Sequence, residues 1–337
     1  MFLIALASST TIGHAASHQA TGDDATQFTR HKHLVEHVTS QGCAYCPWGD
    51  HVLELLAQMR GDIARVSIHN NLGASDQFRT FKADAVGQLL GYNAMPEAAF
   101  DRTPFDGVFM QVVSIQPEYA HDKAQALSDQ LDTNVITPVL ADVVIDAAYD
   151  EATRLLSVTV SGDVKSNFES TFGNAVGLTI YLTEDSLVAW QQDGATRVED
   201  FVHNNVFRET MTNYKGDQLK WNDDKTHYQN EYSYTLKNNW VPENMNIVAF
   251  VHCSTSTVPI QPVINCQTMA IRELLPQPIL PAPGDVTGDG QVDIADVNAV
   301  IDIMLGKAEQ TAAADVTGDG QADIADVNAV IDIMLGK

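Results

Sequence analysis

The stretch Leu34-Val-Glu-His-Val-Thr-Ser-Gln-Gly-Cys43-Ala-Tyr-Cys46-Pro-Trp48 decides the fold of the first part of this 337-residue chain. Residues 34–38 predict a strand, and residues 41–47 predict a loop. The residues that follow predict a helix over 48–59, because its apolar side chains recur at helical spacing. These apolar side chains are Val52, Leu55, Leu56 and Met59. The order strand, loop, helix places two cysteines where the helix begins.

A thiolate at a helix N-terminus is stabilised by the helix dipole and by free backbone N–H groups, which makes such a cysteine reactive. Two residues separate Cys43 from Cys46, so the pair can close as a disulfide. The alternative is half of a zinc site. It lacks a second pair nearby, because Cys253 and Cys266 lie in another segment and the histidines of 31–33 alternate as on a solvent-facing strand.

An α/β pattern continues to residue 133. Ile63–His69 predicts a second strand, and Phe78–Leu90 predicts a helix. A turn at Met95-Pro96 leads into a strand that ends at Phe100, and Pro117–Leu131 predicts another helix.

From about residue 134 the apolar period changes from 3.6 to 2, which is typical of short strands in a β-sandwich. The predicted strands are Val143–Ile145, Leu155–Val160, Leu178–Leu182, Ser186–Trp190, Tyr232–Leu236 and Ile247–His252. Cys253 and Cys266 flank a loop in this region. We expect a disulfide between them, worth about 3 kcal/mol by chain-entropy arithmetic.

Residues 31–133 resemble the thioredoxin fold, whose cis-proline loop faces the C-x-x-C pair. The resemblance implies that Cys43 is the attacking thiol, Cys46 the resolving thiol and Pro96 the cis-proline at a substrate groove.

Three departures from active thioredoxins stand beside this resemblance. Gln41-Gly42 replaces the expected tryptophan, and Pro47 follows the second cysteine instead of preceding it. His37 occupies the place of the family's buried carboxylate, with Glu36 one residue away. Turnover and a static disulfide therefore both stay open.

Residues 31–275 together resemble a Bacteroidetes outer-membrane protein family that joins a thioredoxin-like domain to a β-sandwich. Besides the cysteine pair and Met95-Pro96, the resemblance rests on Leu178–Leu182, Glu184-Asp185, Val188–Gln191, His203–Arg208 and Ile247–His252. It implies a surface or adhesive role more than a defined chemistry.

A 23-residue unit occurs twice at the C-terminus, as Asp285–Lys307 and Asp315–Lys337, with Val292 against Ala322 as the one difference. Each copy begins with a twelve-residue loop of EF-hand spacing, which supplies oxygen ligands and needs glycine at its sixth position. The predicted calcium ligands are Asp285, Thr287, Asp289, Gln291, Asp293 and Asp296, then Asp315, Thr317, Asp319, Gln321, Asp323 and Asp326. The sequence therefore predicts two calcium ions.

The helix after each loop carries apolar residues that neither copy can bury alone, so the two copies should pack on each other. In the first copy these are Ile294, Val297, Val300, Ile301, Met304 and Leu305. Residues 285–337 resemble the type I dockerin, which implies a protein partner, either a cohesin-like domain or another part of this chain. Ile294-Ala295 and Ile301-Asp302 replace the polar and basic residues through which dockerins bind cohesins.

The sequence thus predicts a multidomain chain with an α/β thioredoxin-like domain, an all-β Ig-like sandwich and a small helical calcium module. The expected segments are a signal peptide at 1–16, a linker at 17–30, the three domains at 31–133, 134–275 and 285–337, and a proline-rich linker at 276–284. The apolar start that ends on small residues indicates export, although the usual basic region is missing.

The chain has 44 acidic and 19 basic residues and a net charge of −25, which disfavours nucleic acid as a partner. No apolar run is long enough to cross a bilayer as a helix. Residues 285–337 hold 11 acidic and 2 basic residues, so this short tail carries −9 of the charge.

These features favour an exported cell-surface, outer-membrane or extracellular protein that assembles with partners through its calcium-binding tail. A thiol-disulfide oxidoreductase that uses Cys43 and Cys46 is the first alternative. The second is a component of a carbohydrate-degrading complex, which rests only on the association of dockerins with such complexes.

Overall fold

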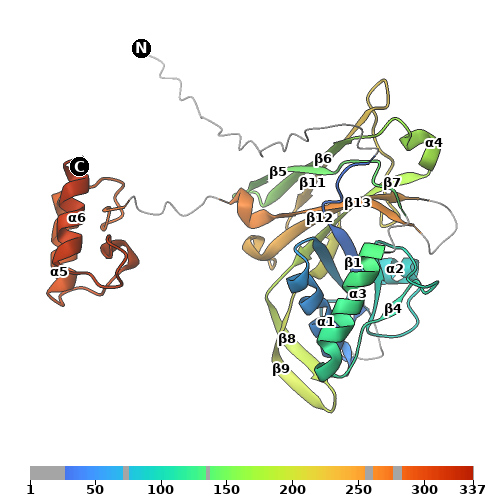
Figure 1. Cartoon of the computed structure of the whole chain (residues 1–337), viewed down its shortest axis with the longest axis horizontal. Helices are drawn as coiled ribbons and strands as arrows, with labels where there is room; N and C mark the ends of the chain where they lie inside the picture. The colour runs from blue at the N-terminus through green and yellow to red at the C-terminus, as the bar shows by residue number, and fades with distance from the viewer. Residues whose placement is uncertain (1–26, 71–75, 134–136, 255–260, 276–282, 337) are drawn as a thin grey trace. The chain divides into compact units, whose positions relative to one another are not determined.

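The computed structural model describes residues 27–70, 76–133, 137–254, 261–275 and 283–336 (Figure 1). The chain forms two compact units, one that ends at Leu275 and one that begins at Pro276. The predicted signal peptide, the predicted linker up to residue 26 and residues 276–282 of the proline-rich linker lie outside the described residues.

The first part of the chain follows the predicted α/β order. Its elements are β1 (His33–Thr39), α1 (Cys46–Met59), β2 (Ile63–His69), α2 (Phe81–Leu90), β3 (Glu97–Phe100), β4 (Gln111–Val112), a 3-10 turn (Pro117–Tyr119) and α3 (Ala120–Thr133). Strand β1 runs parallel to β2 and antiparallel to β3. Helix α2 begins later than predicted because the Thr80 side chain caps it and accepts the N–H of Ala83 at 3.0 Å.

The second part is rich in strands. Its elements are β5 (Val144–Asp150), β6 (Leu155–Asp163), α4 (Phe168–Phe172), β7 (Val176–Glu184), β8 (Leu187–Asp193), β9 (Thr196–His203), β10 (Val206–Thr210), β11 (His227–Thr235), β12 (Met245–Cys253) and β13 (Val263–Ala270), with 3-10 turns at Pro242–Asn244 and Ile271–Leu274. Strands β9, β10 and β13 were not predicted.

One eight-stranded sheet joins the two parts, in the order β13-β12-β7-β10-β2-β1-β3-β4. The junction is the parallel pairing of β10 with β2, where Val206 lies opposite Ser67. This differs from the expected arrangement of separate domains at 31–133 and 134–275, because four strands of the expected sandwich extend the sheet of the thioredoxin-like part. The remaining sandwich-like element is a three-stranded sheet, β11-β6-β5, which packs on β7 and β12.

The large sheet is covered on both faces. Helices α1 and α3 pack over β1 and β3 through residues such as Leu53, Phe100 and Leu127, while α2 packs on the opposite face through Val86 and Leu90. The N-terminus of α1 therefore lies at one edge of a rigid core.

The expected disulfide between Cys253 and Cys266 is not formed, and both thiols are free. In the pairing of β12 with β13, Cys266 lies opposite Phe250, three residues before Cys253. Because side chains alternate across a sheet, Cys253 packs with the core under the three-stranded sheet, and Cys266 packs in the core on the other face. The two sulfurs thus point to opposite sides.

A buried guanidinium ties the two parts together. Arg102 is 1% exposed and donates to both carboxylate oxygens of Glu36 on β1, at 2.7 and 2.8 Å, and to the Tyr181 hydroxyl on β7 at 3.0 Å. Its other bond is to Gln261 Oε1 at 3.0 Å. Burial alone would lower the pKa of Arg102, but the Glu36 charge raises it, so the guanidinium stays charged.

The C-terminal unit consists of two acidic loops, each followed by a helix. The first loop leads into α5 (Ile294–Met304) and the second into α6 (Ile324–Met334), and a 3-10 turn at Ala312–Ala314 precedes the second loop. The two copies pack on each other as predicted, through buried Val297 and Val300 of α5 and Val327 and Val330 of α6.

The prediction that the apolar residues of α5 are buried between the two copies is wrong for three of them. Ile294, Met304 and Leu305 are 61%, 41% and 58% exposed. They lie at the two ends of the helix, outside the central turn that contacts α6.

Replacing Glu36 by Gln leaves a charged guanidinium buried without its counter-ion, and we expect the free energy of unfolding to fall by about 3–5 kcal/mol. Urea unfolding followed by tryptophan fluorescence measures this loss in the first unit, because all four tryptophans (Trp48, Trp190, Trp221 and Trp240) lie there. The control is Glu199→Gln, which removes an exposed ion pair with Arg197 and should change little. Equal stability of the two variants would contradict the role given to the buried pair.

Candidate functional site

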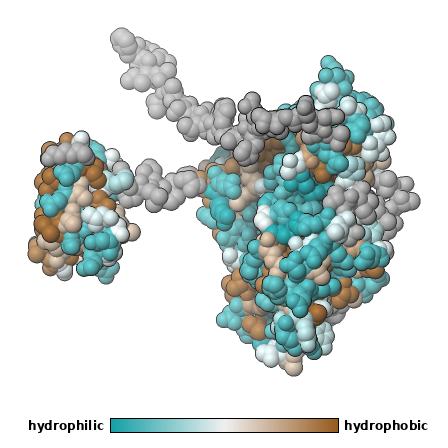
Figure 2. Space-filling view, in the orientation of Figure 1, coloured by the Kyte–Doolittle hydropathy of each residue, from teal (hydrophilic) through white to brown (hydrophobic). Residues whose placement is uncertain are grey.

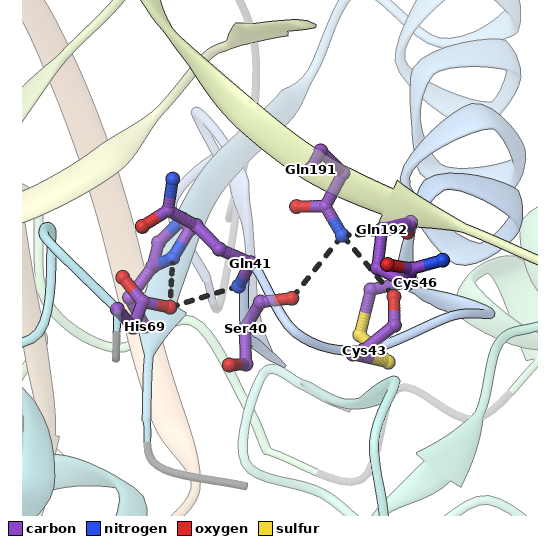
Figure 3. Close-up of a disulfide and its surroundings, with 8 residues drawn as sticks. Ser40, Gln41, Cys43, Cys46, His69, Gln191 and Gln192 are labelled. Atoms are coloured by element: carbon purple, nitrogen blue, oxygen red, sulfur yellow. Dashed lines mark hydrogen bonds and ion pairs between the residues drawn. A yellow bond between two sulfur atoms is a disulfide. The ribbon is translucent and has the colours of Figure 1, made fainter. Parts of the chain in front are cut away.

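The Cys43–Cys46 pair forms a disulfide at the N-terminus of α1, with its Cα atoms 5.3 Å apart (Figure 3). The loop is closed by the N–H of Cys43 on the carbonyl of Ser40, at 3.1 Å, and by the N–H of Cys46 on the carbonyl of Cys43, at 3.3 Å. Tyr45 precedes the helix and makes no side-chain cap. The helix dipole therefore acts on the sulfurs without competition from a capping carboxylate.

Pro96 follows a cis peptide bond and packs directly against α1 near the disulfide. Gly49 of α1 makes this approach possible, because a Cβ there would lie 2.7 Å from Pro96 Cγ. The structure thus brings together Cys43, Cys46 and Pro96, the three predicted redox-site residues.

The disulfide is buried, with Cys43 4% and Cys46 1% exposed. Its cover is the two-stranded β8–β9 hairpin from the second part of the chain (Figure 3). The Gln191 amide on β8 donates to the carbonyls of Ser40 and Cys43, at 3.2 and 3.1 Å. In return the Gln41 amide donates to the carbonyl of Trp190 at 2.7 Å.

Backbone hydrogen bonds also hold the hairpin on the cysteine loop. The N–H of Gln192 donates to the carbonyl of Gln41, and the N–H of Gly194 to that of Ala44, both at 2.8 Å. At the hairpin tip, Trp48 Nε1 donates to Asp193 at 3.1 Å. These bonds hold the hairpin against the loop that contains the buried cysteines.

Polar side chains fill the space behind the disulfide. His69 on β2 pairs with the buried Asp76 at 2.8 Å, and Arg65 pairs with Asp50 of α1. Burial lowers the pKa of His37 and of His203, each to about 4, so both imidazoles are neutral near pH 7.

In this chain, neither His37 nor Glu36 places a carboxylate where the thioredoxin family has its buried one. His37 faces α1, with neither ring nitrogen bonded to another described residue. Glu36, its neighbour on β1, points to the opposite face of the sheet, where it binds Arg102. No carboxylate from β1 is therefore available behind the cysteine pair.

Sequence reasoning missed Gln191 and His203, because a hairpin that is distant in sequence gives no local sign of what it covers. Both residues lie in segments that carry the family resemblance, Val188–Gln191 and His203–Arg208, and the strand that contains His203 was not predicted.

The two C-terminal loops hold their acidic residues in similar positions. Asp285 accepts the N–H groups of Gly288, Asp289 and Gly290, at 2.8 to 3.2 Å, and Asp315 does the same in the second loop. The sixth-position glycines have φ of +87° and +91°, which explains the requirement for glycine there.

The last acidic residue of each loop is buried. Asp296 accepts the N–H groups of Thr287 and Asp293, both at 2.8 Å, and Asp326 repeats this pattern. Burial raises the pKa of both carboxyls, but these backbone bonds outweigh it, and the net effect keeps them ionised.

The donor set fits a hard cation. Carboxylate oxygens of Asp315, Asp319 and Asp326 lie within 4.8 Å of one another, a grouping that could hold a metal ion. Asp293 and Asp323 instead cap their helices and accept the N–H groups of Ala295 and Ala325 at 2.7 Å. Thr287, Asp289 and Gln291, like Thr317 and Gln321, lie in the same loops.

A C-x-x-C disulfide at a helix start, beside a cis-proline, is typical of thioredoxin-like folds, and paired acidic loops are typical of dockerin-type units. The family profile of outer membrane protein Omp28 matches residues 89–274, and that of the dockerin type I domain matches residues 283–335. The first match covers more than half of the chain, and the protein belongs to the Omp28 outer membrane protein family.

One solved structure is similar in fold to this chain. HBP35 of Porphyromonas gingivalis is similar over 76% of this chain and 81% of its own, with a TM-score of 0.60 and 17% identity. A domain of the outer membrane lipoprotein Omp28 from the same organism is 21% identical over 40% of this chain and 89% of its own; its TM-score of 0.27 is too low for a comparison of folds. No curated protein matches this chain.

Family membership and the dockerin domain identify an exported cell-surface protein. Among the described residues, no helix is both long and apolar enough to span a membrane.

Replacing Gln191 by Leu removes the side-chain bonds that hold the hairpin on Ser40 and Cys43, each worth about 1 kcal/mol. We expect dithiothreitol to reduce the Cys43–Cys46 disulfide about 30-fold faster in this variant, since the two bonds sum to about 2 kcal/mol and 1.4 kcal/mol corresponds to a factor of ten. The rate is measured by alkylating the freed thiols at successive times and counting the added groups by mass spectrometry. Gln229→Leu, which loses only an exposed contact with Glu231, is the matched control. Equal rates in all three proteins would show that the hairpin does not guard the disulfide.

Proposed function

We propose that this protein is a surface assembly module. Its dockerin-type tail binds two calcium ions, one in each loop, and then a protein partner. The observation that carries this proposal is the pair of acidic loops whose helices already pack on each other through valines. Dockerin type I domains bind calcium and take part in protein–protein interactions, and the acidic cluster at Asp315, Asp319 and Asp326 suits the cation.

The surface of the tail supports binding through apolar contacts. Ile294 and Leu305 are 61% and 58% exposed, and their counterparts Ile324 and Leu335 are 61% and 57% exposed. Figure 2 shows brown, apolar patches on this unit. Such patches on a small unit are typical of interaction sites. Because apolar residues replace polar anchors, the partner would be a cohesin-like domain with an apolar rather than a charged docking face, or another part of this chain.

A second function has its own support. The disulfide at the start of α1, with Pro96 packed beside it through Gly49, suits thiol-disulfide exchange with an exported protein. The buried position of the sulfurs implies that the β8–β9 hairpin opens during each exchange.

For the assembly function, we expect calorimetry of the full chain to show two bound calcium ions, and none in the double variant Asp296→Asn/Asp326→Asn, which removes one buried carboxylate from each loop. Asp302→Asn, on the exposed surface of α5, is the matched control.

The partner is tested with a type I cohesin as the probe, with calcium and with a chelator. Calcium-dependent binding that Ile294→Asp/Ile324→Asp abolishes supports the apolar docking face. If the cohesin stays free and calcium also leaves the protease sensitivity of the first unit unchanged, neither partner is correct.

For the second function, we expect the full chain to catalyse reduction of insulin by dithiothreitol, and Cys43→Ser to lose this activity because the attacking thiol is gone. Turbidity of the released insulin chain measures the rate. Cys253→Ser, which changes a thiol packed in the core under the three-stranded sheet, should keep it. The same rate in the Cys43→Ser variant would eliminate the oxidoreductase function.

A further inference from the structure

A small, partly open cavity adjoins Cys46 of the disulfide. It lies between the N-terminus of α1, strand β2 and the hairpin, and it has a volume of about 10 Å³. Its lining includes Cys46, Asp50, Ser67, His69, Gln191 and His203. This volume is close to that of one water molecule, and the lining is polar enough to hold it.

Two polar atoms in the cavity wall have no hydrogen-bond partner among the described residues. They are Ser67 Oγ and His203 Nε2, on residues that are 4% and 5% exposed. His203 also bonds the backbone of Trp190, and since Nε2 is unbonded this bond uses Nδ1–H. Nε2 of the neutral ring is then an acceptor, and leaving a buried acceptor unbonded is costly. Both atoms are satisfied if a water occupies the cavity.

We propose that a water in this cavity connects Cys46 Sγ with Nε2 of His203, and that His203 is the proton acceptor for the resolving thiol. The inference rests on the thiol-disulfide exchange described above as the second function. It also means that the redox site is completed by the second part of the chain, because His203 is the last residue of β9.

The Cys43 thiolate attacks a substrate disulfide, which releases one substrate sulfur as a thiolate and leaves the other in a mixed disulfide with Cys43. The Cys46 thiol then passes its proton through the water to Nε2 of His203. The Cys46 sulfur attacks the Cys43 sulfur, the Cys43–Cys46 bond forms, and the bond to the substrate breaks. The second substrate sulfur leaves as a thiolate that takes a proton from solvent, and the imidazolium releases its proton through the same water to the solvent. The protein is oxidised and the substrate disulfide is reduced.

The charges around His203 are compatible with this role. Burial keeps the ring neutral near pH 7, and His69 adds to this effect, while Asp50 and Asp76 favour the charged ring. The other candidates are occupied: Asp50 is paired with Arg65 and His69 with Asp76. His37 does not line the cavity. A developing thiolate on Cys46 adds a negative charge that stabilises the imidazolium.

The test follows resolution of a mixed disulfide in the full chain. Reduced protein is mixed with oxidised glutathione between about pH 5.5 and 8.5. The reaction is quenched with acid, and the products are identified by mass spectrometry. Conversion of the glutathione adduct into the Cys43–Cys46 disulfide gives the rate. The variant His203→Gln keeps a polar side chain but has no base. His227→Gln on β11, an exposed histidine paired with Asp163, is the control.

We expect the wild-type and control rates to vary little between pH 6 and 8. In His203→Gln, the rate should fall about 100-fold at pH 6 and rise about tenfold per pH unit, because hydroxide must then remove the proton. An unchanged pH profile in the variant, or a slowing that is the same at every pH, overturns the proposal.

The failure of this inference can be told apart from failure of the second function. If the wild-type protein resolves the adduct and His203→Gln does so equally well, exchange stands and the proton relay falls. If neither the wild-type protein nor the Gln191→Leu variant, whose hairpin is loosened, forms an adduct, both the exchange function and the proton relay are wrong. His203→Asn, compared at a temperature where thermal melting shows it folded, replaces the Gln variant if the latter unfolds.

Discussion

The structure depends on the buried ion pair between Arg102 and Glu36, because this pair fixes how the two parts of the first unit share one sheet. The guanidinium bonds a strand of the thioredoxin-like part through Glu36 and a strand of the second part through Tyr181. Asp101 and Arg102 have φ of +47° and +48°, in the left-handed region that non-glycine residues avoid. The turn after β3 therefore holds a strained backbone in order to direct this side chain into the sheet.

Sharing one sheet has a direct consequence for the cysteine pair. Once β10 lies beside β2, the β8–β9 hairpin that precedes β10 is positioned over the start of α1. The second part of the chain then supplies both the cover of the disulfide, through Gln191, and a histidine in the cavity beneath it. The added strands therefore contact the site as well as extend the sheet.

Local patterns in the sequence were sufficient for the elements that build the cysteine site. The spacing of Val52, Leu56 and Met59 marks α1, and Ile63–His69 is β2 to the residue. What could not be predicted depends on contacts between distant segments. The opposite directions of Cys253 and Cys266 follow from the register of β12 with β13, and the separation of Glu36 from His37 follows from which face of β1 each one occupies. In the tail, periodicity marked Ile294 and Leu305 as apolar, but only the short overlap of α5 with α6 decides that they stay exposed.

The four cysteines illustrate how an exported protein keeps different sulfur chemistry apart. Disulfides persist outside the cytoplasm, so free thiols there are at risk of exchange with the Cys43–Cys46 bond. Burial raises the pKa of the Cys253 thiol and raises that of Cys266 well above its usual value, and the thiolate is the attacking species in exchange. Cys43 lies at a helix N-terminus, where a thiolate is stabilised instead. The sheet that separates Cys253 from Cys266 thus prevents their pairing, and their burial keeps both of them from attacking the one disulfide that the protein forms.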